Sequence, residues 1–165
     1  MHSIKRLMFI LPLMMVLQGC QQSLGPMSPA VSKLVEQAAV ASQQGQTEVA
    51  RCRLSSAVAI DPENALALYN WGVLENQAGL YDVSAALLEK ANKLSSGSSD
   101  TLYVLLDSQY KQFLAYKNDK KHTPQELEDL KNNAMQTAEA FLKISGNKDE
   151  GRASVEQLLK DLKSS

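Results

Sequence analysis

Apolar and small residues recur at helical spacing along most of the chain after residue 30, and this pattern repeats. Residues 65–98, shifted back by 34 positions, align with residues 31–64. The matching positions are Ala38, Ala50, Leu54, Ala57 and Pro62 in the first window, against Gly72, Ser84, Leu88, Ala91 and Ser96 in the second. Between the windows, Asp61-Pro62-Glu63-Asn64 stops one helix and starts the next. A period of this length predicts stacked helix pairs, and therefore an all-α chain.

The pattern changes after residue 98 but stays helical. Ser98-Ser99-Asp100 is a helix-start signal, and apolar residues at helical spacing follow it. After a charged loop, Thr123-Pro124-Gln125-Glu126 combines a threonine cap, a first-turn proline and a glutamate that can reach back, which predicts another helix start. Residues 99–148 are therefore predicted to form a third, longer helix pair. A single apolar stripe predicts a capping helix within residues 149–165; it consists of Val155, Leu158, Leu159 and Leu162.

The second window carries a family resemblance. Leu68-Tyr69-Asn70-Trp71-Gly72 and Gly79-Leu80-Tyr81-Asp82, followed by Ser84, Leu88 and Ala91, resemble a tetratricopeptide repeat (TPR). The resemblance implies a right-handed superhelix of stacked antiparallel helix pairs, with repeats at residues 31–64 and 65–98 and a degenerate third repeat at residues 99–148. Small residues such as Gly72 let neighbouring helices approach, and Gly45 and Gly79 allow the left-handed backbone that ends a helix. The alternative is an unrelated helical bundle, in which small and large residues also alternate.

The N-terminus resembles a bacterial lipoprotein signal. Residues 1–20 have two basic residues near their start, Lys5 and Arg6, followed by an apolar stretch that is too short to span a bilayer. They end in Leu17-Gln18-Gly19-Cys20, which resembles a lipobox. The resemblance implies that Cys20 carries the lipid. Gln21, in place of Asp, implies sorting to the outer membrane, with the protein on its periplasmic face. Residues 21–30 read as a short flexible tether. The alternative is an ordinary cleaved signal peptide with a chance cysteine.

Composition argues against several classes of function. A formal net charge of −1 provides no basic field for nucleic acid. Beyond the signal segment there is a single histidine, His122, in a lysine-rich loop, so we expect no catalytic site, metal site or cofactor, and no enzyme activity. Cys52 lies between Arg51 and Arg53, which would lower its thiol pKa if all three were exposed. It is either a thiol that forms a mixed disulfide with a partner or a small residue on a helix.

The resemblance also implies a binding surface. In TPR arrays the first helix of each pair lines the concave groove. Carried over to this chain, that face contains Val35, Ala39, Ser42, Tyr69, Val73, Asn76, Gln77, Tyr103, Asp107 and Tyr110. Three tyrosines in a row suit the binding of a protein or peptide partner. The alternative is that the tyrosines pack against residues 124–145, which would then fill the groove. Recognition of a C-terminal carboxylate is not supported, because Val35 and Val104 stand where basic residues would be expected.

Together these features predict an adaptor or assembly factor anchored to the outer membrane. Similar small TPR lipoproteins serve pilus and secretion machines, so the resemblance implies a partner among periplasmic or outer-membrane components of such a system. An alternative of the same kind is a regulator that docks periplasmic cell-wall enzymes at the membrane.

Overall fold

The computed structural model describes residues 28–119, 121–146 and 151–164 of the chain. Every regular element in these ranges is an α-helix. The helices are α1 (Pro29–Gln43), α2 (Thr47–Ile60), α3 (Ala65–Gln77), α4 (Tyr81–Leu94), α5 (Ser99–Asn118), α6 (Pro124–Ile144) and α7 (Arg152–Ser164). The predicted signal segment, Cys20 and most of the predicted tether lie outside the described residues; α1 begins at Pro29, inside the range assigned to the tether.

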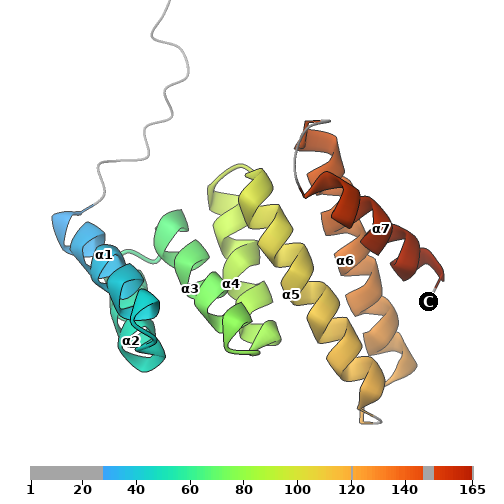
Figure 1. The fold of residues 1–165 in the computed structure, drawn as a ribbon, viewed down its shortest axis with the longest axis horizontal. Coiled ribbons are helices and arrows are strands. Elements are labelled where there is room, and N and C mark those ends of the chain that lie inside the picture. Colours follow the sequence, from blue (N-terminus) through green and yellow to red (C-terminus); the bar gives the residue numbers. More distant parts are fainter. Residues whose placement is uncertain (1–27, 120, 147–150, 165) are drawn as a thin grey trace, which may run out of the picture.

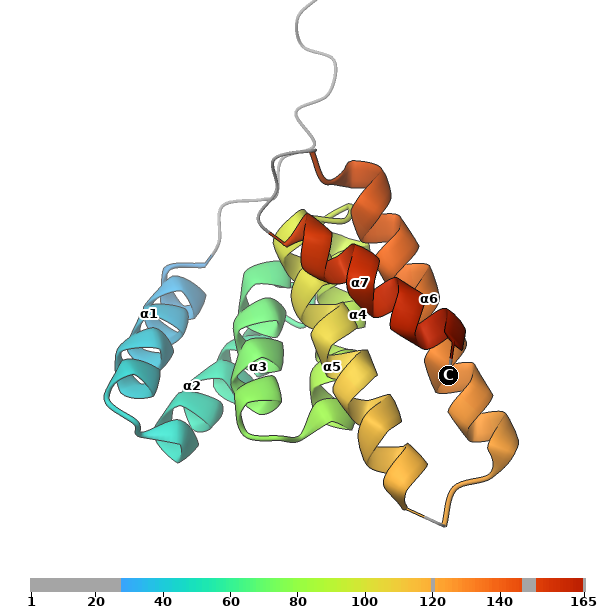
Figure 2. The ribbon, with the colours of Figure 1, turned by 45° about the vertical axis from the view of Figure 1, so that its right-hand side comes forward.

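The helices form consecutive pairs that stack along one axis (Figure 1). α1 packs on α2, α3 on α4 and α5 on α6, while α2 contacts α3 and α4 contacts α5 between the pairs. α7 lies across α6 at the end of the stack (Figure 2). The prediction of an all-α stack of helix pairs with a C-terminal capping helix is confirmed.

Glycine ends two of the first helices, as the sequence predicts. Gly45 and Gly79 have φ angles of 72° and 79°. After α3, the N–H of Gly79 donates to the Asn76 carbonyl (3.1 Å) and the N–H of Leu80 donates to the Glu75 carbonyl (2.9 Å). These two bonds satisfy carbonyls that the end of a helix leaves free, and they require the left-handed residue that glycine supplies. The result is a tight reversal that holds the paired helices together.

Side-chain caps fix the starts of α3, α5 and α6. The Asn64 side chain accepts a hydrogen bond from the N–H of Ala67 (2.9 Å), and the Ser98 hydroxyl accepts one from the N–H of Thr101 (3.1 Å). At α6 the predicted cap is confirmed as a reciprocal box: Thr123 accepts from the Glu126 N–H, and the Glu126 carboxylate accepts from the Thr123 N–H. Such caps satisfy backbone donors that the first turn of a helix leaves free.

The core consists of three adjoining clusters. One joins α1, α2 and α3 and includes Leu54 and Leu74. A small central cluster of Ala85, Leu88 and Leu105 joins α4 to α5, and a third cluster joins α5, α6 and α7. α7 buries Val155 and Leu162 of its predicted stripe, while Leu158 and Leu159 are partly buried. Each helix therefore contributes one apolar face to its neighbours, as stacked repeats require.

Candidate functional site

A hollow of about 220 Å³ lies between the first helices of the first two pairs. We call it the α1–α3 groove. Its lining residues are Ala38, Ala39, Ser42 and Gln43 of α1, Leu54 of α2, and Asn70, Val73, Leu74 and Gln77 of α3. The floor is apolar, because Ala38, Leu54 and Leu74 are buried, whereas Gln43 and Gln77 at the rim are exposed.

The local sequence explains this shape. Ala38 and Ala39 provide little side-chain volume, so α1 leaves space beside α3. On α3, Asn70, Val73 and Gln77 are spaced by three and four residues and so lie on one face of the helix. The polar groups of the lining are amides and a hydroxyl, without a charged side chain. Amides both donate and accept hydrogen bonds, which matches the alternating donors and acceptors of a peptide main chain.

Farther along the same face, a polar network joins α3 to α5. Asn76 Nδ2 donates to Asp107 Oδ2 (3.0 Å) and to Ser108 Oγ (2.6 Å), and Lys111 Nζ donates to both Asp107 Oδ2 (2.7 Å) and Asn76 Oδ1 (3.2 Å). Ser84 continues the network into α4. Asn76 and Asp107 were predicted to contact a partner. In the structure the buried Asn76 amide and the Asp107 carboxylate, whose side chain is 40% exposed, link the second pair to the third; their contact with a partner stays a prediction.

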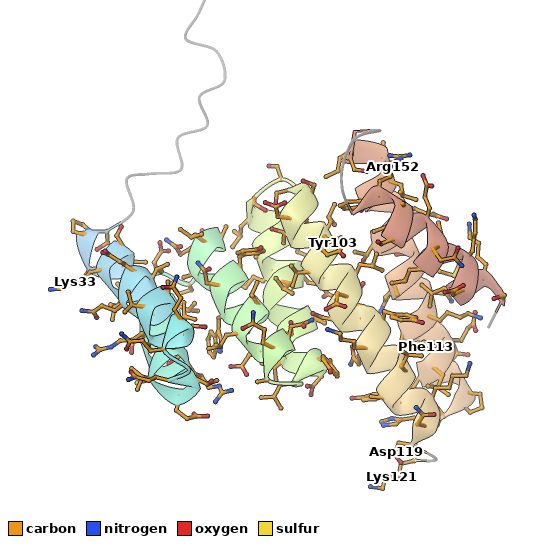
Figure 3. All side chains as sticks on the ribbon, in the orientation of Figure 1. Lys33, Tyr103, Phe113, Asp119, Lys121 and Arg152 are labelled. Atoms are coloured by element: carbon orange, nitrogen blue, oxygen red, sulfur yellow. The ribbon has the colours of Figure 1, made fainter. Side chains whose placement is uncertain are left out.

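The three predicted tyrosines have different surroundings. Tyr69 packs against the central cluster, and burial, with Asp100 as a second cause, raises the pKa of its phenol. Tyr110 packs against the cluster of α5, α6 and α7. Tyr103 is 42% exposed; its ring centroid lies 5.9 Å from that of Phe141 on α6. Figure 3 places Tyr103 on the same side of the stack as Arg152, where α7 starts, and Asp119 and Lys121 on the opposite side. For Tyr103 the structure therefore shows the alternative arrangement, contact with residues 124–145.

Of the remaining predicted site residues, Val73 and Gln77 line the α1–α3 groove, together with Ala39 and Ser42. Val35 does not: it is 8% exposed and belongs to the core of α1, α2 and α3. Residues 124–145 do not fill this groove either, because α6 pairs with α5 and carries α7. Sequence reasoning missed Gln43 as a lining residue, although its place four residues after Ala39 was the available signal.

An ion pair between the partly exposed Arg51 and the buried Glu75 joins α2 to α3. Glu75 is 1% exposed and accepts hydrogen bonds from Arg51 Nε (2.6 Å), Arg51 Nη2 (2.9 Å) and Trp71 Nε1 (2.7 Å). The Arg51 hydrogen bonds lower the pKa of the Glu75 carboxyl against the opposing effect of burial, and Trp71 adds to the lowering. Arg51 also pairs with Glu48, and hydrogen bonds to both carboxylates raise the pKa of its guanidinium. Arg51 is thus paired with these two carboxylates. Cys52, the next residue in the chain, is an exposed free thiol.

The described residues contain no group of three or more His, Cys, Asp and Glu side chains placed to hold a metal ion. Within the same ranges, no helix combines the length and apolar character needed to cross a bilayer. His122 stacks on Tyr116 with ring centroids 3.6 Å apart and an interplanar angle of 7°, and its Nδ1 lies 3.8 Å from Glu126.

Comparison with known proteins identifies the fold. No protein-family model matches the chain, and the search of curated proteins found no match. Among solved structures, the type III secretion translocator chaperone SycD of Yersinia enterocolitica aligns with a TM-score of 0.63 at 13% identity, over 81% of this chain and 83% of that one. A mutant O-GlcNAc transferase of Thermobaculum terrenum aligns with a TM-score of 0.60 at 18% identity, over 85% of this chain. The chain spans only 23% of that transferase. Both neighbours contain TPRs, so the chain has the fold of a TPR-like superhelix of helix pairs.

Proposed function

We propose that the protein is an adaptor that binds an extended segment of a protein partner in the α1–α3 groove. The observation that carries the proposal is the lining of this groove: an apolar floor under a rim of uncharged amides and a hydroxyl. An extended peptide offers both chemistries at once, because its main chain pairs with amides and its side chains fill an apolar floor.

The size of the groove favours a peptide over a small-molecule ligand. Pockets for drug-sized ligands have volumes of roughly 300–1,000 Å³, whereas the groove has about 220 Å³. This volume accommodates one or two side chains of a longer segment, with the rest of the segment lying along α1 and α3. The lack of charge in the lining favours a segment that is neutral where it enters the groove.

The setting that we propose is the periplasmic face of the outer membrane, with a lipid on Cys20 as the anchor. The sequence Leu17-Gln18-Gly19-Cys20 and the residue that follows it support this placement. Several acyl chains would make such attachment effectively permanent, since each buried methylene contributes about 0.8 kcal/mol. The partner would then be a component of a pilus or secretion system, and the likeness to a type III secretion translocator chaperone makes secretion components the first to test.

A matched pair of variants tests the groove. Val73→Glu places a carboxylate in the α1–α3 groove, whereas Val83→Glu places one on an exposed position of α4. Quantitative pull-down of the lipidated protein from membranes should recover the partner with the wild type and with Val83→Glu, and lose it with Val73→Glu. If Val73→Glu remains folded by circular dichroism and recovers the same partner in the same amount, the groove is not the binding site. Cell-wall enzymes as the recovered partners would favour the docking-regulator alternative.

A further inference from the structure

A second hollow, of about 240 Å³, lies between α4, α5 and α6, away from the α1–α3 groove. We call it the α4–α6 pocket. Its rim includes the exposed Lys93 and the partly exposed Glu89 of α4, and its deeper part includes Gln109 of α5 and Thr137 of α6, both of which are buried. Asn92 of α4 also lines it. Polar groups from three helices therefore meet in this pocket.

The Gln109 side chain has an unpartnered acceptor. Gln109 is 4% exposed, and its Nε2 donates to Glu89 Oε1 at 3.3 Å. A carboxylate only accepts hydrogen bonds, so this contact fixes which end of the amide is the donor. The other end, Gln109 Oε1, is buried and has no hydrogen-bond partner among the described residues. Buried acceptors in folded proteins are nearly always paired, so this atom indicates that a donor belongs there.

We propose that the α4–α6 pocket binds a guanidinium group, presented by an arginine of a protein partner. The pocket offers the Gln109 amide oxygen and the Glu89 carboxylate, and a guanidinium has five N–H donors in a planar fork, enough to serve both. The volume fits a side-chain head group and is below that of pockets for whole small molecules. Lys93 opposes a cation, but its side chain is exposed and free to extend into solvent, where its charge is screened. This site lies between α4, α5 and α6 and shares no residue with the α1–α3 groove, so it does not depend on the function proposed for that groove.

Titration with capped amino acids tests the proposal on the full chain in detergent micelles. N-acetyl-arginine methylamide is compared with the lysine analogue and with the citrulline analogue, which has the shape of arginine without its charge. The side-chain amide resonances of Gln109 and Asn92 are the reporters. We expect a saturable shift with the arginine probe in the millimolar range, and at least severalfold weaker binding of the other two. No shift, or equal shifts with all three probes, would overturn the proposal.

Variants that change the charge of the pocket test whether the ligand is a cation or an anion. Glu89→Gln should weaken binding of the arginine probe about tenfold, because it removes a charged acceptor but keeps an oxygen for Gln109. Lys93→Met should tighten binding by roughly twofold to fivefold, because it removes a like charge at the rim. Lys90→Met, an exposed lysine of α4 outside the pocket lining, should change nothing. If Glu89→Gln tightens binding and Lys93→Met weakens it, the pocket takes an anion and the proposal is wrong.

Discussion

Gly72 on α3 and Leu88 on α4 are packed so closely that Gly72 has no room for a side chain. A Cβ atom at Gly72 would lie 2.5 Å from Leu88 Cγ and 2.9 Å from Leu88 Cδ2, well inside van der Waals contact. Leu88 is fully buried in the central cluster, so it cannot simply turn aside. This contact sets the separation of the two helices of the second pair.

We therefore expect Gly72→Leu to destabilise the fold. Overpacking typically costs about 1–3 kcal/mol, and Gly72→Ala should cost less because alanine favours the helix by about 1 kcal/mol. Urea denaturation measures the change. Gly146→Ala is the control, since a Cβ there would meet no atom within 4 Å. Equal stability of Gly72→Leu and wild type would contradict the packing of α3 on α4.

The Arg51–Glu75 pair should matter chiefly because Glu75 is buried. Arg51→Met leaves the Glu75 carboxylate without its cation, and breaking such a pair costs about 3 kcal/mol or more. The double variant Arg51→Met/Glu75→Met should recover much of this loss, because it also removes the buried charge. Chemical denaturation of the two variants at pH 7 measures the difference. A single variant as stable as the wild type would show that the pair does not hold α2 to α3.

The same pair predicts a pH dependence. The pKa of Glu75 is lowered in the folded protein, so its stabilising contribution is complete above the ordinary glutamate pKa of about 4.3 and is lost as the pH falls through the lower folded value. In Arg51→Met the cation is missing, so burial raises the pKa of Glu75 above its ordinary value. The variant therefore becomes more stable as the pH falls and Glu75 takes up a proton. The stability gap between wild type and Arg51→Met should therefore narrow between pH 7 and pH 4. A gap that is constant with pH would contradict this assignment.

Tyr103 should secure the capping helix. Its ring faces Phe141, and a Cβ on Gly151, the residue before α7, would lie 2.9 Å from Tyr103 Cε2. Tyr103→Ala should thus increase amide hydrogen exchange in α7 by about tenfold, while α1 to α4 keep their protection. Tyr116→Ala, at the far end of α5, is the matched control. Unchanged exchange in α7 would show that Tyr103 does not support the cap.

The proposed anchor predicts a change of compartment. Cys20→Ser should move the protein from the membrane fraction to the soluble periplasmic fraction, and wild type should incorporate labelled fatty acid. Cys52→Ser is the control, because Cys52 is an exposed helical thiol. A Cys20→Ser variant that stays in the membrane fraction, together with an unlabelled wild type, would rule out lipid attachment at Cys20.

The helix pairs and their turns could be predicted because the sequence repeats. The spacing of small residues and the glycines at positions 45 and 79 are local signals, so the helix pairs and their turns follow from sequence. The cap at Thr123 is equally local. The sequence before α6 lacks the turn of the earlier repeats, so it leaves open whether residues 124–145 continue the stack or fill the groove.

Side-chain contacts between the repeats could not be predicted from the sequence. Glu75 and Asn76 are polar residues in a helix, which usually face solvent, and nothing local shows that Arg51 and Asp107 lie opposite them. Val35 was placed on the groove face for a related reason. Helical spacing shows which residues share a face of α1, but it does not show which of them the neighbouring helices bury. Gln109 Oε1 lacks a hydrogen-bond partner at a place where three helices meet, and this arrangement is seen only in the structure.

Site-specific photo-crosslinking tests the central claim most directly. A photoreactive amino acid replaces Gln77 in the α1–α3 groove, or the exposed Val83 near the start of α4, in the lipidated protein in intact cells. Adaptor binding in the groove predicts a discrete crosslinked product from position 77 that disappears in the Val73→Glu background, and none from position 83. A partner that crosslinks from position 83 but not from position 77 would contradict the account.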